Sequence, residues 1–169
     1  CGATGRELAW LADRYECSVT GVDAAARDQV FKDPRLRLFK GGAHELVHLC
    51  GTGHGRVVAI DCAYHFVEFE LFLVEAFCTL RPGGRLSFSH VCGRGLPRQL
   101  CRVLGVHTIE SIDALKRCAT RAGFVNIEIR VLPNILERWR LACGGRLAYI
   151  VVTADRPASK TPRPRVAAP

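Results

Sequence analysis

The sequence predicts an α/β protein with a doubly wound, Rossmann-like and mostly parallel sheet. Apolar, β-branched segments alternate with segments of helical periodicity along most of the 169 residues. Residues 56–61 (RVVAID) form a continuous apolar run between Gly-rich stretches, which is typical of a strand buried on both faces. The alternating pattern of residues 125–131 and the glycines that follow it predict an antiparallel strand at the carboxyl-terminal end.

The predicted helices carry apolar residues three or four positions apart, as at Leu8, Leu11 and Ala12. In chain order, they cover residues 6–15, 24–31, 66–79 and 109–122. Pro34 and Gly123 mark where two of them have ended.

The predicted strands are short runs of β-branched or alternating residues. In chain order, they cover residues 18–23, 36–39, 56–61, 85–91, 125–131 and 147–153. The R-P-G-G stretch at residues 81–84 predicts a tight turn before the fourth of these strands.

The charge pattern divides the chain into a domain over residues 1–155 and a basic, Pro-rich tail over residues 156–169, which we expect to be disordered. The net charge is +8, and the tail contributes four basic residues and no acid to it. The domain itself is therefore only mildly basic. No aromatic residue lies among the tail's charges, so we expect no nucleic-acid partner.

Nine cysteines are scattered along the chain, and no pair has C-x-x-C spacing. We expect buried thiols in a reducing compartment, the cytoplasm, rather than disulfides or a metal site. The sequence shows neither an apolar run long enough to span a membrane nor a signal peptide. The histidines form no metal-binding spacing.

A Gly-containing loop and a later acid suggest a nucleoside cofactor. The loop C-G-A-T-G comprises Cys1, Gly2, Ala3, Thr4 and Gly5 and directly precedes a helix, where backbone N–H groups are unpaired. The next predicted strand ends in an acid at position 23, where a carboxylate can accept hydrogen bonds from ribose hydroxyls. The same acid could instead cap the following helix. These features do not separate a nicotinamide cofactor from S-adenosylmethionine.

Three motifs make that separation: D-C-A-Y-H-F at residues 61–66, L-R-P-G-G-R-L at residues 80–86 and A-G-F-V-N-I-E-I at residues 122–129. With them the chain resembles the class I S-adenosylmethionine-dependent methyltransferases of the type-11 group, which act on small molecules in fungi and plants. The resemblance implies a seven-stranded sheet with the cofactor at the carboxyl ends of the first strands. It also implies an acceptor pocket above the fourth and fifth strands.

The resemblance also implies cofactor-binding residues in this chain. They are Cys1, Gly2, Ala3, Gly5, Asp23, Ala24, Asp61 and Cys62. Asp23 would bind the ribose, and Asp61 and Cys62 would lie beside the sulfonium. We expect His65 to act as a base or to orient the acceptor, and Tyr64 to orient it through its hydroxyl. Both side chains could instead serve packing or helix capping.

The chain departs from the family pattern in four places. It begins inside the cofactor loop, so the first strand, expected between residues 18–23 and 56–61, is missing. The loop has one extra residue between its glycines. Gly42 stands where the family often has an acid that Glu45 could replace, and His90 stands where another acid is common.

The sequence leaves three alternatives to a small-molecule methyltransferase. The first is a degenerate, non-catalytic methyltransferase-like scaffold. The second is a nicotinamide-dependent oxidoreductase, against which the incomplete G-x-G-x-x-G pattern counts. The third is a nucleic-acid methyltransferase, for which an N-P-P-[YF]-like motif that would hold a flipped base is absent.

Overall fold

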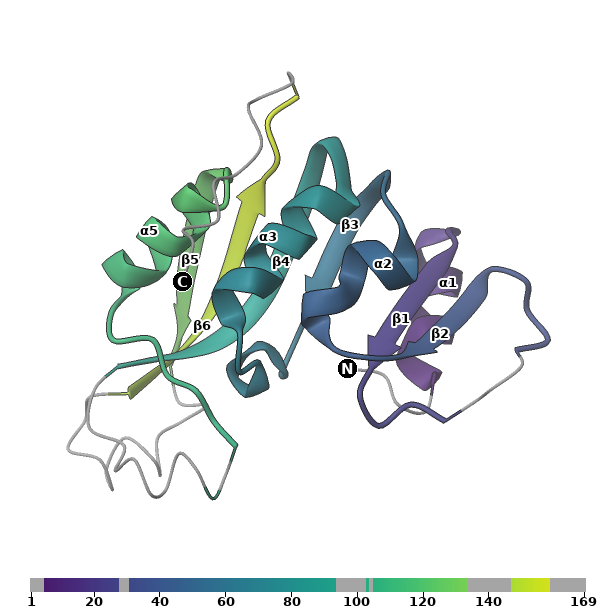
Figure 1. The fold of residues 1–169 in the computed structure, drawn as a ribbon, viewed down its shortest axis with the longest axis horizontal. Helices are drawn as coiled ribbons and strands as arrows, with labels where there is room; N and C mark the ends of the chain where they lie inside the picture. Colours follow the sequence, from purple (N-terminus) through teal and green to yellow (C-terminus); the bar gives the residue numbers. More distant parts are fainter. Residues whose placement is uncertain (1–4, 28–30, 94–102, 104, 134–146, 159–169) are drawn as a thin grey trace.

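The computed structural model describes residues 5–27, 31–93, 103, 105–133 and 147–158. Its helices are α1 (Arg6–Tyr15), α2 (Leu46–Cys50), α3 (Phe69–Thr79) and α5 (Ile112–Arg121), with 3₁₀ turns η1 (Ala43–Glu45) and η2 (Ala63–His65) (Figure 1). Its strands are β1 (Val19–Asp23), β2 (Leu36–Lys40), β3 (His54–Ala59), β4 (Leu80–Gly93), β5 (Val125–Leu132) and β6 (Leu147–Asp155). The predicted α/β class is confirmed.

The strands form two sheets. β1 and β2 pair in parallel, and a four-stranded sheet has the order β3-β4-β6-β5. β3 and β4 are parallel, whereas β6 runs antiparallel to both of its neighbours. The predicted antiparallel strand at the carboxyl-terminal end is thus confirmed.

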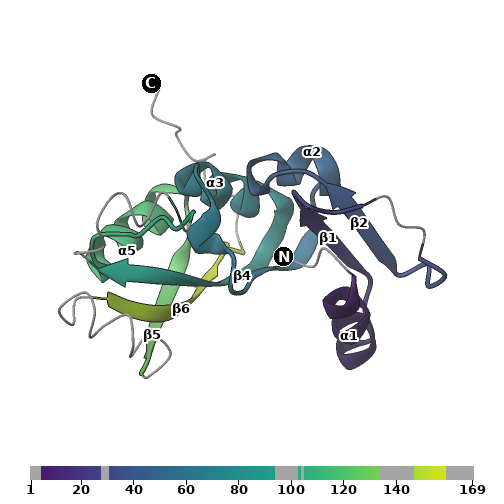
Figure 2. The same ribbon diagram turned by 90° about the horizontal axis from the view of Figure 1, so that it is seen from below.

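The helices lie on both sides of the strands. α2, α3 and α5 lie on one side, and α1 lies on the other side against β1 (Figure 2). The main core lies between the four-stranded sheet and its helices, where the rings of Phe72 and Phe88 meet edge to face with centroids 6.2 Å apart.

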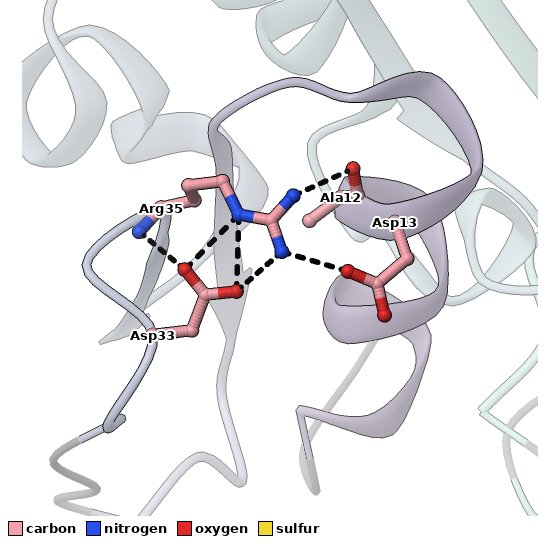
Figure 3. Close-up of polar contacts among 4 residues, drawn as sticks. All are labelled: Ala12, Asp13, Asp33 and Arg35. Carbon is pink, nitrogen blue, oxygen red and sulfur yellow. Dashed lines mark hydrogen bonds and ion pairs between the residues drawn. The ribbon is translucent and has the colours of Figure 1, made fainter.

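A smaller core joins α1 to β1 and β2 through Leu8, Ala12 and Leu36. Beside it, the Arg35 guanidinium connects the residues just before β2 to α1 (Figure 3). Its Nη2 atom lies 2.6 Å from Asp33 Oδ2 and 2.7 Å from Asp13 Oδ1. This planar group holds both carboxylates at once, which a lysine cannot do in the same geometry.

A groove separates the two sheets. In the described part of the chain, no ladder joins β1 to β3. A cavity of about 1200 Å³ lies between them, lined by residues 18–23 on one side and 54–59 on the other. Val58 on the β3 side is 50% exposed. The groove lies between the strands where the sequence analysis expected a further strand.

Two predicted elements were wrong in detail. Residues 24–25 form a turn and residues 26–27 are not helical, so the helix predicted over residues 24–31 does not begin there; residues 28–30 lie outside the described ranges. The R-P-G-G turn lies inside β4, whose pairing with β3 is irregular near His54. α2 and η1 were not predicted, because their apolar stripe is short.

The described part of the chain continues beyond the predicted boundary at residue 155, to residue 158. Arg156 donates from Nη1 to the carbonyl oxygens of Phe77, at 2.7 Å, and Leu80. Its guanidinium carbon lies 4.7 Å from the centroid of the Phe77 ring. Arg156 therefore packs against the end of α3 and the start of β4.

Candidate functional site

The candidate site lies at the carboxyl ends of β1 and β3, which belong to different sheets and border the same cavity. In α/β proteins, ligands bind at the carboxyl ends of the strands. Asp23 ends β1, and Cys62 and His65 follow β3 in the turn that contains η2. All three residues line the large cavity, together with Ala24 and Gly42. The structure therefore brings together residues that are up to 42 positions apart in the sequence.

Asp23 organises the loop that follows β1. Its Oδ1 atom accepts the N–H of Ala25 at 2.8 Å, and its carbonyl oxygen accepts the N–H groups of Ala26 and Gly41. The Asp23 side chain therefore closes a local turn and does not cap a helix. The carboxylate still lies at the cavity wall, so both predicted roles are compatible.

Only one residue of the C-G-A-T-G loop is described. Cys1, Gly2 and Ala3, all predicted to bind the cofactor, lie outside the described residues. Gly5 is the N-cap of α1 with φ of 74°, a left-handed conformation that favours glycine. It is buried and does not line the cavity.

Gly41 and Gly42 bring the chain close to the cavity from the β2 side. A Cβ atom at Gly42 would lie 2.4 Å from the His44 ring, so a larger residue here would require the exposed His44 side chain to move. The carboxylate of Glu45 accepts the Gly42 N–H at 2.8 Å. Glu45 does not line the cavity, so here it caps the turn and does not replace the missing acid at its wall.

His65 is exposed and has a defined hydrogen bond. Its Nδ1 atom lies 2.7 Å from the carbonyl oxygen of Gly105. A carbonyl only accepts, so Nδ1 carries the proton in the neutral ring and Nε2 keeps its lone pair. In this tautomer Nε2 can accept a hydrogen bond from a neighbouring group.

Cys62 forms part of the cavity wall from within the core. Its side chain is 1% exposed, and burial raises the pKa of its thiol. The thiol therefore stays protonated at neutral pH, and a protonated thiol is a poor nucleophile.

Asp61 and Tyr64 lie beyond the cavity lining and contact each other. Tyr64 donates its hydroxyl proton to Asp61 Oδ1 at 2.7 Å. Burial, and then the Asp61 carboxylate, raise the pKa of Tyr64 above its ordinary value. Tyr64 therefore has no proton left to donate to an acceptor and can orient one only through its oxygen lone pairs.

The sequence analysis missed two polar residues of this region, Ser89 on β4 and Tyr149 on β6. Ser89 is completely buried and Tyr149 is 7% exposed, and their hydroxyl oxygens lie 2.7 Å apart. Polar residues inside otherwise apolar strands were the available signal. Their partners could not be identified without the antiparallel register of β4 and β6.

His90 lies on the opposite face of β4, inside the main core. Its ring stands edge-on to Phe69 with centroids 4.6 Å apart, and Nδ1 donates to the carbonyl of Val91. Burial lowers the pKa of His90 to about 4. The residue is therefore neutral, and it does not take the place of a site carboxylate.

Two further searches concern the described residues only. Among them, no group of three or more His, Cys, Asp or Glu side chains has a metal-binding arrangement. None of the helices in these ranges combines the length and the apolarity needed to cross a membrane.

The relatives found by sequence are methyltransferases. No family model matches the chain. Methyltransferase GfsG of Streptomyces halstedii is 24% identical over 156 residues, which cover 83% of this chain and 55% of that protein. Erythromycin 3″-O-methyltransferase of Saccharopolyspora erythraea is 25% identical over 165 residues, with 82% and 53% covered. The chain thus spans about half the length of these curated relatives.

Solved structures share the fold. A geranyl diphosphate methyltransferase in complex with SAM superposes with a TM-score of 0.72 at 19% identity, over 92% of this chain and 75% of that one. The [4+2]-cyclase SpnF superposes with a TM-score of 0.68 at 18% identity, over 94% and 74%.

The fold is that of the class I S-adenosylmethionine-dependent methyltransferases, as the sequence motifs predicted. Within that class, both curated relatives carry the name of a methyltransferase, and one of these names specifies O-methylation of a small molecule.

Proposed function

We propose that the chain is the cofactor-binding and catalytic part of an S-adenosylmethionine-dependent methyltransferase acting on an oxygen, nitrogen or carbon nucleophile of a small molecule. The observation that carries this proposal is the meeting of Asp23, Cys62 and His65 at one cavity, at the carboxyl ends of parallel strands. The matched methyltransferases, whose names include an O-methyltransferase and a C-methyltransferase, support the same reaction class.

The cavity fits the proposed cofactor. The cavity of about 1200 Å³ includes the groove between β1 and β3, and we place the cofactor only in its part at the carboxyl ends of these strands. Asp23 and Ala24 would hold the ribose, and Gly42 lines the same cavity without a side chain. The bound cofactor supplies a methyl carbon activated by its sulfonium.

The protein's own contribution is alignment and proton removal. His65 Nε2 would take the proton of an O–H or N–H acceptor, while the Nδ1–H bond to Gly105 fixes the ring. Cys62 and Phe66 supply apolar wall and exclude water from one side of the cavity. This division of roles requires no metal ion.

The first test is calorimetric titration of the folded chain with S-adenosylhomocysteine, with folding checked by circular dichroism. We expect micromolar binding, about −8 kcal/mol, that disappears in Asp23→Ala and persists in Asp113→Ala. Asp113 is a matched exposed acid on α5, outside the cavity. A folded chain that does not bind would support the non-catalytic scaffold instead.

A parallel titration with NADH tests the oxidoreductase alternative. Binding of NADH without S-adenosylhomocysteine binding would overturn the proposed cofactor. Methyl transfer is measured separately with labelled S-adenosylmethionine, because a cyclase shares this fold and cofactor binding alone does not establish the reaction.

We also propose that an extended segment from outside residues 1–169 lies in the groove between β1 and β3, parallel to both. Each of these strands is paired on one edge only in the described residues, and their facing edges line one cavity. Strands rarely leave such edges uncovered. The half-exposed Val58, which lines the cavity, would be covered by this segment.

Hydrogen exchange tests the position of this segment. In a chain extended at its amino terminus, we expect slower exchange at backbone amides of β1 and β3 than in the 169-residue chain. The amides of β6, which is paired on both edges, serve as the reference. Equal protection of β1 and β3 in both chains would contradict the proposal.

A further inference from the structure

Four polar side chains converge beside the cavity, and we call them the Asp61 cluster: Asp61, Tyr64, Ser89 and Tyr149. The hydroxyl oxygen of Tyr64 lies 2.7 Å from Asp61 Oδ1, and that of Tyr149 lies 3.0 Å from the same atom. The Ser89 hydroxyl lies 2.7 Å from the Tyr149 hydroxyl and 2.7 Å from the Asp61 backbone nitrogen. The cluster thus links the end of β3 to β4 and β6.

Each hydroxyl proton of the Asp61 cluster can be assigned to one hydrogen-bond acceptor. The carboxylate can only accept, so both tyrosines donate to it. The single proton of Tyr149 is then used, and Ser89 must donate to the Tyr149 oxygen. The Asp61 N–H in turn donates to the Ser89 oxygen. Burial raises the pKa of Tyr149, which keeps its hydroxyl protonated for this role.

The cluster holds Asp61 in an unfavourable backbone conformation. Its φ is 58°, in the left-handed region that non-glycine residues seldom adopt. Such strain persists only where surrounding bonds fix it, and it concentrates at functional sites. Here the hydroxyls of Tyr64 and Tyr149 and the bond from the Asp61 N–H to Ser89 supply that support.

The positions of the cluster that remain for a ligand can only accept hydrogen bonds. No described residue bonds to Asp61 Oδ2, and Asp61 is exposed. The oxygen of Tyr64 keeps a lone pair. The neighbouring His65, whose ring centroid lies 4.5 Å from that of Tyr64, also offers an unprotonated Nε2. Toward a ligand, the Asp61 carboxylate and the Nε2 atom of His65 can therefore only accept hydrogen bonds.

We propose that the methyl acceptor carries two neighbouring hydrogen-bond donors, as a vicinal diol or amino alcohol does, with Asp61 binding one donor and His65 receiving the proton of the other. This inference rests on the proposed function. A carboxylate or phosphate at the same position is excluded, because it would place acceptors against the Asp61 carboxylate.

The transfer step is balanced with these residues. The acceptor O–H gives its proton to His65 Nε2, and the oxygen lone pair forms the new bond to the methyl carbon. The carbon–sulfur bond breaks, and its electron pair stays on sulfur in the thioether product. Asp61 exchanges no proton in this step and only positions the second donor.

Fluorine NMR of the chain labelled with 3-fluorotyrosine tests donor selection without requiring turnover. The chain has three tyrosines, so three signals are expected. Tyr15 on α1 is 64% exposed and lines the cavity near the start of β1, so its signal reports binding away from the Asp61 cluster. The probes are trans-cyclohexane-1,2-diol, cyclohexanol and trans-cyclohexane-1,2-dicarboxylate, each titrated to its solubility limit.

We expect the diol to shift the signals of Tyr64 and Tyr149 and to bind about tenfold more tightly than cyclohexanol. The dicarboxylate should shift neither signal. In Asp61→Asn the preference for the diol should be lost. Asparagine tolerates the left-handed backbone, so this variant is expected to fold. Asp113→Asn is the matched control and should keep the preference.

Equal responses to the diol and dicarboxylate, an unchanged response in Asp61→Asn, or no response to any probe would overturn the proposal. The proposed function fails separately, through absent S-adenosylhomocysteine binding. With an active chain, Tyr149→Phe should raise KM for the diol at least fivefold more than KM for cyclohexanol. A purely structural role would change both equally.

Discussion

The Nδ1 atom of His65 lies 2.7 Å from the carbonyl oxygen of Gly105, a residue 40 positions later in the chain. The N–H of His107 donates to the carbonyl of Tyr64 at 2.6 Å, so the same segment is bonded twice to the turn after β3. The orientation of the proposed base is therefore set by backbone groups that precede α5.

This relationship predicts different outcomes for two substitutions of His65. His65→Asn places an amide nitrogen where Nδ1 was, and it retains the bond to Gly105 but provides no base. Methyl transfer to an O–H acceptor should fall by roughly 10²–10⁴-fold, while S-adenosylhomocysteine binding stays within twofold in calorimetry. His65→Ala should lose the activity and also loosen the segment at Gly105.

The exposed His48 on α2 provides the control, since it does not line the cavity. His48→Asn should leave methyl transfer unchanged. Retention of near-normal turnover in His65→Asn would show that the proton leaves by another route.

Acid stability should depend on His90. Its pKa falls from 6.5 in the unfolded chain to about 4 in the folded one, mainly through burial. The folded state therefore binds fewer protons, and stability declines as pH falls from 6.5 toward 4. The expected loss is about 3 kcal/mol, measured by urea denaturation across this pH range.

His90→Leu should remove this part of the pH dependence, because leucine does not titrate and fits an apolar site beside Phe69. His48→Leu changes an exposed histidine and should keep the full slope. If the pH profiles of His90→Leu and the parent chain coincide, carboxylates and not His90 govern the acid transition.

Arg35 should stabilise the unit of α1, β1 and β2 through its two carboxylate partners (Figure 3). Arg35→Lys keeps the charge but cannot bridge Asp33 and Asp13 in the same plane. We expect faster hydrogen exchange in α1 and β2, with little change in β6. Uniform protection in the variant would show that the apolar contacts of Leu8 and Leu36 suffice.

The sequence predicted the elements better than it predicted the polar contacts of the site. α1 and β1 follow from local periodicity, and Ser111, which accepts the N–H of Ala114, begins α5 inside the predicted helix. The helix predicted after Asp23 failed because that side chain closes a local turn instead.

The site was predictable where one motif contained its residues. D-C-A-Y-H-F contains both Asp61 and His65, and periodicity placed it after a strand. Tyr149 and Ser89 come from distant strands, and only their register brings them to Asp61. The bond to Gly105 was equally inaccessible, because a backbone carbonyl has no signature in the sequence.

Arg156 should be a determinant of stability although it begins the Pro-rich end of the chain. It donates to the carbonyls of Phe77 and Leu80 at the end of α3 and stacks over the Phe77 ring. Arg156→Met keeps the apolar stem but leaves these carbonyls without a donor. The expected cost is about 2–4 kcal/mol of unfolding free energy, measured by urea denaturation.

Arg121→Met is the matched comparison, because the Arg121 ion pair with Glu70 is largely exposed, at 64% and 68% for the two side chains. That change should cost less than about 1 kcal/mol. An equally small effect of Arg156→Met would mean that water replaces the guanidinium at the end of α3, and the boundary at residue 155 would then hold in energetic terms.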